Sequence, residues 1–336
     1  MKQVAASDLK TVLHSKRANI YYLEHCRVLV NGGRVEYVTD EARRSLYWNI
    51  PIANTTTVLL GTGTSVTQAA VRELSKAGVM IGFCGGGGTP LFAGTETELE
   101  VAWFPPQSEY RPTEYLQNWA SFWFDDGLRL AAAKLFQKSR LANIKVHWIR
   151  SKTLKDQGFS IDTASLDAVV DRAAGTIDAA HDQTALLTEE ARLTKELYRL
   201  ASRATSYGSF TRVKRGDGVD PANRFLDHGN YLAYGLGATA SWVLGLPHSL
   251  AVLHGKTRRG GLVFDVADLV KDAVILPQAF VSAVKGHNEQ EFRQACIEAL
   301  TRFEALDVMI ETLKSTSVAL GRRLPKTLPP DADTGA

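Results

Sequence analysis

The sequence predicts an α+β protein with two domains: a small N-terminal domain that is mostly β and sandwich-like, and a larger all-α domain after it. Three observations predict this class. The chain has 336 residues, more than one ordinary hydrophobic core holds. Its first third shows short β-rich runs between turns, and helical spacing of apolar residues follows a proline-rich stretch. Hydrophobic residues at 45% and charged residues at 22% are typical of a folded globular chain.

The N-terminal domain is predicted from β-rich runs and the turn signals between them. Asn31-Gly32-Gly33 is a hairpin signal. Ser65 is placed to cap a helix that ends at Lys76, before Gly78. The predicted strands are Ile20–Val30, Arg34–Thr39, Tyr47–Ile52, Thr55–Leu60 and Val79–Cys84.

The second domain is predicted to contain six or seven helices, with glycine and proline punctuation between them. From Thr113 onward, Leu, Trp and Phe recur at helical spacing up to Leu135. The further helical segments are Ala164–Ala174, Thr188–Ser206, Asp220–Leu244, Phe264–Val284 and Glu289–Lys314.

These patterns place the domain boundaries. Residues 1–105 form the β domain, and residues 106–322 form the all-α domain. Pro105-Pro106 and Pro112 mark the change of pattern between them. Residues 323–336 are polar and proline-rich, so we expect a disordered tail.

Charge and cysteine content limit the class of protein. The net charge of +3 is only mildly basic, so any case for DNA binding depends on local patches. The three cysteines, Cys26, Cys84 and Cys296, are far apart and have no CxxC spacing, which is typical of reduced thiols. The sequence shows neither a signal-peptide pattern nor an apolar run long enough for a membrane span. We therefore expect a cytoplasmic protein that does not bind membranes.

Two glycine-rich loops resemble nucleotide-binding loops but lack the rest of the fingerprint. Gly85–Gly88 follows a predicted strand, yet an extended Thr-Pro-Leu-Phe segment comes next instead of a helix or a GK[ST] sequence. Gly61–Ser65 precedes a helix but lacks the remaining motif residues. We interpret the first loop as a hairpin or hinge and the second as a turn.

Three segments of the all-α domain carry residues suited to metal chemistry. Glu189 and Glu190 lie near the start of one predicted helix, His254 ends a short apolar run, and Asp265 and Asp268 share a helix face. Each has an ordinary structural explanation when taken singly, such as a helix cap or a core histidine. Together, carboxylates and one imidazole suit Mg²⁺ or Mn²⁺ better than a thiolate zinc site.

Basic residues lie next to these segments in the sequence. The first group, Lys256, Arg258 and Arg259, follows His254, and the second, Arg212, Lys214 and Arg215, follows the Glu190 helix. Arginine and lysine bind phosphates, and a divalent cation polarises a phosphodiester. The residues alone thus indicate a metal-dependent phosphodiesterase.

Four ordered motifs resemble the CRISPR-associated endonuclease and integrase of spacer acquisition, in its subtype I-F form, over nearly the whole chain. The motifs are Glu190 with Lys195-Glu196-x-Tyr198, the pair Asp220 and Asn223, His254 with its basic neighbours, and Asp265-x-x-Asp268. The resemblance implies that Glu190, His254 and Asp268 bind the metal, and that Asp265 supports the site or binds a second ion. Glu189 adjoins Glu190, but the offset to Tyr198 favours Glu190.

The resemblance also implies partners and a reaction. It implies a homodimer formed through the N-terminal domain, double-stranded and branched DNA as substrate, and a second CRISPR adaptation protein that in subtype I-F is fused to a helicase-nuclease. The DNA contacts would come from the two basic groups and from Asn223. A DNA 3′-hydroxyl would attack a phosphodiester of the repeat, so the reaction is a transesterification with Mg²⁺ or Mn²⁺.

Two other functions stay open at this point. One is a DNA-binding scaffold without catalysis, and the other is a helical metal enzyme acting on a small diphosphate. The number of metal ions and the residue that activates the nucleophile are also open, with Tyr198, Tyr207 and His228 as candidates.

Overall fold

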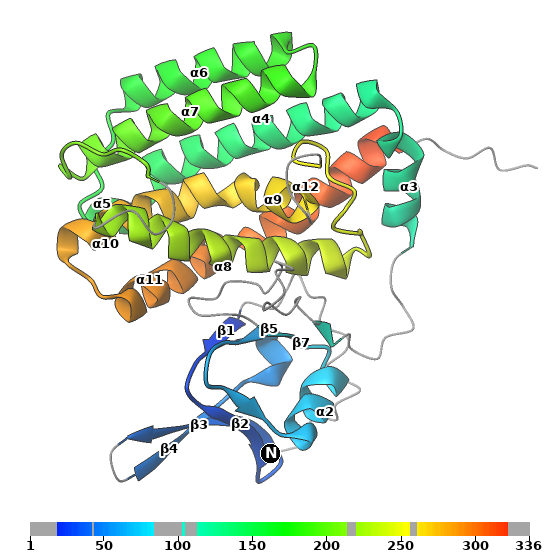
Figure 1. Cartoon of the computed structure of the whole chain (residues 1–336), viewed down its shortest axis with the longest axis vertical. Coiled ribbons are helices and arrows are strands. Elements are labelled where there is room, and N and C mark those ends of the chain that lie inside the picture. The colour runs from blue at the N-terminus through cyan, green and yellow to red at the C-terminus, as the bar shows by residue number, and fades with distance from the viewer. Residues whose placement is uncertain are drawn as a thin grey trace, which may run out of the picture.

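The computed structural model describes residues 19–41, 44–83, 103–104, 113–213, 220–255 and 261–321. A β-rich N-terminal part lies beneath a larger helical part (Figure 1). This arrangement confirms the predicted fold class. Among the described residues, no helix is both long enough and apolar enough to cross a membrane.

The N-terminal part contains two four-stranded sheets and helix α2 (Gln68–Lys76). One sheet has the order β1-β5-β7-β8, and the other has the order β4-β3-β2-β6. The strands are β1 (Asn19–Leu23), β2 (Arg27–Asn31), β3 (Arg34–Glu41), β4 (Arg44–Asn49), β5 (Thr55–Leu60), β6 (Ser65–Val66), β7 (Met80–Phe83) and β8 (Trp103–Phe104).

Local sequence explains most of these elements. Gly32 and Gly33 both have positive φ between β2 and β3, as the predicted hairpin requires. Strand β5 is buried on both faces and pairs in parallel with β1 and β7, which accounts for its continuous apolar and Thr run.

Three predicted boundaries in this part were wrong. The run from Ile20 to Val30 is two strands in different sheets, because the chain changes sheet at His25, whose φ is +49°. Thr67, and not Ser65, caps α2, since its side chain accepts a hydrogen bond from the Ala70 amide. The strand predicted up to Ile52 ends at Asn49, before Pro51.

The helical part contains ten α-helices and one π-helical segment among the described residues. These are α3 (Glu114–Trp123), α4 (Asp126–Arg150), α5 (Lys152–Asp156), α6 (Thr163–Ala179), α7 (Gln183–Ala204), α8 (Pro221–Val243), α9 (Gly261–Val270), the π-helical segment (Lys271–Ile275), α10 (Leu276–Lys285), α11 (Glu289–Arg302) and α12 (Ala305–Leu320).

The predicted helix count was low because the short helix α5 was not predicted and because predicted helices are interrupted. The run from Glu289 breaks at Glu304, which has a left-handed backbone. The run from Phe264 contains Pro277, and the chain takes a wide π turn just before it. Side chains of α4 bind carbonyls there: Asn143 binds Leu269 O at 2.9 Å, and Trp148 binds the carbonyls of residues 272 and 273 at 3.1 and 3.2 Å.

Helix α9 is the core of the helical part. Nearly all of its residues are buried, and it packs against α4, α8 and α12. Helix α8 approaches it closely because Gly237 lacks a side chain: a Cβ atom there would lie 2.7 Å from the carbonyl oxygen of Val263. This contact fixes the position of α9 relative to its neighbours.

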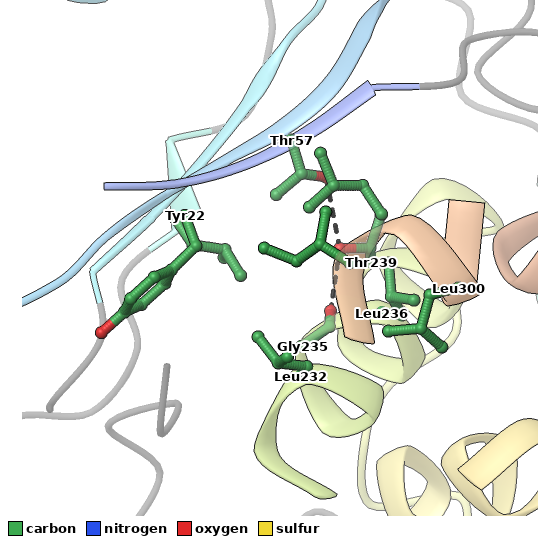
Figure 2. A pocket seen from close by; sticks show the side chains of 10 residues that line it. Tyr22, Thr57, Leu232, Gly235, Leu236, Thr239 and Leu300 are labelled. Carbon is green, nitrogen blue, oxygen red and sulfur yellow. Dashed lines mark hydrogen bonds between the residues drawn. The ribbon is translucent and has the colours of Figure 1, made fainter. Parts of the chain in front are cut away.

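The two parts of the protein meet where α8 and α11 face β1 and β5. Leu232, Leu236 and Leu300 line a small apolar cavity there, opposite Tyr22 and Thr57 (Figure 2). Its volume of about 10 Å³ leaves room for one water molecule at most. Beside it, Arg293 pairs with Glu24 and lies over the ring of Tyr22. The contact therefore combines apolar packing with an ion pair.

Gly237→Ala is expected to destabilise the protein by about 2 kcal/mol, since the added methyl group overlaps the backbone of α9. The control is Gly175→Ala in α6, where a Cβ meets nothing within 4 Å and helix propensity favours alanine by about 1 kcal/mol. Denaturant unfolding monitored by circular dichroism measures both. Equal stability of the two variants would contradict the close α8–α9 contact.

His147 is expected to make stability depend on pH. Burial against Phe303, followed by the charge of Arg302, lowers the pKa of His147 from 6.5 to about 4. The unfolded chain therefore binds the proton more tightly, and stability present above pH 6.5 is lost as pH falls toward 4. His147→Gln should reduce the loss of unfolding free energy between about pH 7.5 and pH 5 by about 2 kcal/mol. The control is His181→Gln, because His181 is exposed. If His147→Gln loses as much unfolding free energy over this pH range as wild type does, His147 is not the group responsible.

Candidate metal centre

Glu190, His254 and Asp268 come together from three separate segments. Glu190 lies in α7, His254 lies in the connection between α8 and α9, and Asp268 lies in α9. One potential ligand atom of each lies within 4.8 Å of the others. His254 Nε2 is 3.3 Å from Glu190 Oε2. The structure thus gathers two carboxylates and one imidazole, a donor set suited to a hard divalent cation.

Asp265 holds His254 in place. Its Oδ1 atom accepts hydrogen bonds from the His254 amide at 3.0 Å and lies 2.8 Å from His254 Nδ1. Its Oδ2 atom accepts from the amides of Val252 and Leu253 at 2.7 and 3.1 Å. With Nδ1 bound in this way, the ring presents Nε2 to Glu190. Both Asp265 oxygens are occupied, which favours a supporting role over a second ion.

The opposite side of the His254 loop is fixed as well. Trp119, Trp123 and Gln183 donate to the carbonyls of residues 250, 251 and 252, at 2.9, 2.7 and 2.9 Å. The amides of residues 252–254 bind Asp265 on the other side. The loop is therefore held on both sides without belonging to a helix or strand.

The guanidinium of Arg140, in α4, compensates the negative charges of Glu190 and Asp272. It is almost fully buried, donates from Nε to Asp272 at 2.7 Å, and lies 3.6 Å from Glu190. Gln137 and Thr194 accept its remaining hydrogen bonds at 3.2 and 2.9 Å. Burial alone would lower the pKa of Arg140, but the nearby carboxylates outweigh burial and raise it. A permanent positive charge therefore lies behind Glu190.

Asp268 differs from its neighbours. It is 3% exposed, and neither side-chain oxygen accepts a hydrogen bond from any described residue. The ammonium of Lys271, one turn on, contacts Oδ1 as an ion pair. A buried carboxylate is costly unless a cation compensates it, and Oδ2 has no partner among the described residues, so this residue fits a metal ligand.

The electrostatics couple His254 and Glu190. Burial lowers the pKa of His254, yet hydrogen bonding to Asp265 and Glu190 raises it overall to about 10. Burial raises the pKa of Glu190, whereas His254 and Arg140 lower it overall to about 2. Without a bound cation, the pair is imidazolium and carboxylate. A cation that binds Nε2 must replace this proton.

Glu189 and Glu190 face different surroundings. Glu189 is 4% exposed and pairs with Arg172 at 3.1 Å and with Arg192 at 2.6 Å. Glu190, one residue later, faces His254. Of the two neighbours, the structure brings Glu190 to the cluster.

The other predicted site residues are only partly described. Arg212 pairs with Asp227, and Asn223, 3% exposed, binds Arg212 at 2.9 Å and the amide of Val213 at 3.1 Å. The side chain of Asn223 thus shapes the segment that carries Arg212. Lys214, Arg215, Lys256, Arg258, Arg259 and Gly85–Gly88 lie outside the described residues.

The candidates for activating the nucleophile have partners of their own. The Tyr207 hydroxyl donates to Asp220 at 2.7 Å, and burial, then this contact, raise its pKa to about 12. His228 lies 3.7 Å from Glu289. Burial raises the pKa of Tyr198.

Sequence reasoning missed Arg140, Lys271, Asp272 and the two indoles. Asp272 had a signal, because it follows Asp268 by one helical turn. Arg140 had none, since it is fifty positions from Glu190 along the chain and only packing brings them together.

Comparison with known proteins identifies the family. The family model described as "CRISPR associated protein Cas1" matches residues 23–295. The CRISPR-associated endonuclease Cas1 of Pseudomonas aeruginosa (strain UCBPP-PA14) is 66% identical over 94% of this chain and 98% of its own length. That of Pectobacterium atrosepticum is 65% identical over 94% of this chain and 97% of its own length. The predicted resemblance to this family is therefore confirmed.

Solved structures share the fold at low identity. A TtCas1–DNA complex aligns over 92% of this chain and 95% of its own, with a TM-score of 0.61 and 22% identity. A casposase bound to its integration product aligns over 89% and 91%, with a TM-score of 0.65 and 13% identity. A Cas6-RT-Cas1–Cas2 complex aligns over 90% of this chain and 35% of that one, with a TM-score of 0.61 and 13% identity. These structures share the fold of the chain. Because the family model matches most of the chain and the two relatives share about two thirds of its sequence, the chain belongs to the Cas1 family of CRISPR-associated proteins.

Proposed function

We propose that this chain is a metal-dependent DNA endonuclease and integrase that inserts spacer DNA into a CRISPR array. The observation that carries the proposal is the cluster of Glu190, His254 and Asp268, in which the buried Asp268 carboxylate meets the Lys271 ammonium at Oδ1 and has no hydrogen-bond partner at Oδ2 among the described residues. The relatives that share two thirds of the sequence are named endonucleases, and a casposase with the same fold was solved with an integration product.

Glu190, His254 and Asp268 would hold Mg²⁺ or Mn²⁺ through two carboxylates and one imidazole nitrogen. When bound, such a cation polarises a phosphodiester and lowers the cost of charge on the attacking oxygen. Asp265 keeps His254 Nε2 directed at the site, and Arg140 restrains Glu190 by charge. We propose that a DNA 3′-hydroxyl attacks the phosphodiester, which exchanges one ester bond for another; water in its place gives hydrolysis.

The charges around the cluster favour a single divalent cation. Four carboxylates meet there, and Arg140 and Lys271 supply two permanent positive charges. Two negative charges are left, which one divalent cation balances when His254 is neutral. A second ion would leave excess positive charge in a buried site.

The basic groups that flank the site in the sequence would bind DNA. Lys256, Arg258 and Arg259 follow His254 directly, and Lys214 and Arg215 follow the segment that Asn223 holds. Arg212 shares its charge with Asp227, so we assign it a weaker phosphate contact. Phosphate contacts make binding fall steeply with salt.

We further propose the partners of this reaction. The substrates are double-stranded and branched DNA, in keeping with the Cas1–DNA complex of the same fold. A Cas1–Cas2 complex of the same fold supports a second adaptation protein as partner, fused to a helicase-nuclease in subtype I-F. The N-terminal domain (residues 1–105) would form a homodimer beside the catalytic domain (residues 106–322). Function is expected in the cytoplasm.

Glu190→Gln is expected to reduce cleavage and strand transfer of a fluorescent branched DNA by at least about a hundredfold, because a metal ligand is lost. The matched control is Glu189→Gln, whose side chain faces Arg172 and Arg192, and it should keep most of the activity. Assays with Mn²⁺, and with Mn²⁺ removed by chelator, measure both.

Metal-dependent activity that survives in Glu190→Gln would place the site elsewhere. DNA binding by the wild type without any metal-dependent cleavage or transfer would instead indicate a non-catalytic scaffold.

Asp265→Asn is expected to weaken Mn²⁺ binding about tenfold to a hundredfold, since an amide cannot accept all four contacts that fix His254. Calorimetric titration with Mn²⁺ measures the affinity, and circular dichroism checks the fold. Asp182→Asn, at the exposed N-cap of α7, keeps a good cap and should bind as wild type does. Unchanged affinity in a folded Asp265→Asn protein would argue against this supporting role.

A further inference from the structure

Lys271 lies at the edge of the candidate metal centre, where the chain passes from α9 into the π-helical segment. Its ammonium group contacts Asp268 Oδ1 as an ion pair. The side chain of Lys271 is 17% exposed and that of Asp268 is 4% exposed. Because Asp268 is one of the three candidate ligands, this ammonium contacts a carboxylate that the metal would use.

The pair differs from ordinary helix-surface pairs with the same spacing. Lys314 follows Glu311 by three residues in α12, and its Nζ lies 2.7 Å from Glu311 Oε1. There both side chains are solvated, at 33% and 64% exposure, so the pair contributes little to stability. At Asp268 the carboxylate is buried, so removal of its cation leaves an uncompensated charge inside the protein.

The three buried aspartates near the site are compensated in different ways. Asp265 accepts three backbone amides and faces an imidazole, and Asp272 accepts a hydrogen bond from the buried Arg140. Asp268 has no such donor among the described residues, and its oxygens are held by charge. The contact that stabilises Asp268 is therefore one that a metal ion can replace.

We propose that Lys271 is an internal counter-ion of the metal site: it compensates Asp268 while no metal is bound and competes with the metal for the same carboxylate. This inference rests on the proposed metal centre. Competition keeps the affinity for the metal below what the three ligands alone would give. The ion pair between Lys271 and Asp268 keeps the metal-free protein folded. When a metal takes Asp268, the ammonium is released at the edge of the site with its charge intact.

The test compares Mn²⁺ binding and thermal stability of the full chain in wild type, Lys271→Met, Lys271→Arg and Lys314→Met. Lys271→Met should bind Mn²⁺ at least about tenfold more tightly, because no ammonium competes for Asp268. Without metal it should melt at a lower temperature than wild type, and saturating Mn²⁺ should close most of that gap. Lys271→Arg keeps the charge, so its Mn²⁺ affinity and melting temperature should be near those of wild type. Lys314→Met should change neither the affinity nor the melting temperature. Electron paramagnetic resonance of free Mn²⁺ gives the affinity without any activity assay.

The outcomes separate this inference from the proposed function. If wild type binds no Mn²⁺, the metal centre itself fails and the inference with it. If wild type binds Mn²⁺ but a folded Lys271→Met binds equally or more weakly, only the counter-ion role is overturned. Should Lys271→Met fold only in the presence of Mn²⁺, the role is supported. If it folds in neither condition, Lys271→Gln is measured by the same criteria.

Discussion

The structure depends on three buried aspartates and one partly buried glutamate gathered around one apolar helix. Asp265, Asp268 and Asp272 lie along α9 and the segment after it, and Glu190 meets them from α7. An isolated buried charge costs several kcal/mol, so each carboxylate needs compensation within the fold. The fold supplies it in different forms: the backbone amides of the His254 loop, the buried guanidinium of Arg140 and the ammonium of Lys271.

This requirement explains features that are otherwise unusual. Arg140 is almost fully buried in the middle of a long helix, which is rare for arginine, because it joins Asp272 and Glu190. The π turn after α9 leaves carbonyls that Asn143 and Trp148 bind, so α4 secures both the charge and the backbone there. Since α4 both compensates the charge and binds the backbone carbonyls, the site is part of the hydrophobic core of the helical part.

The site is uneven in how firmly its ligands are held. His254 lies in a loop whose amides and carbonyls are bound on both sides, so its ring direction is fixed before any ligand arrives. Asp268 is held by charge, which a metal ion can replace. The direction of the His254 ring is thus set by the fold, whereas the partner that compensates Asp268 is one that a metal ion can replace.

The sequence by itself determined the fold class and most segments and singled out Glu190, His254 and Asp268 as candidate ligands, because hairpin glycines, helical spacing and the four motifs are local signals. Strand β5 and the glycine hairpin came out as predicted. Only the tertiary structure chose between Glu189 and Glu190 on geometric grounds, gave Asp265 its place behind His254, and brought in Arg140 and Lys271. Those choices depend on which helices pack together. Charge compensation in a core is decided by neighbours in space, and a sequence pattern records only neighbours along the chain.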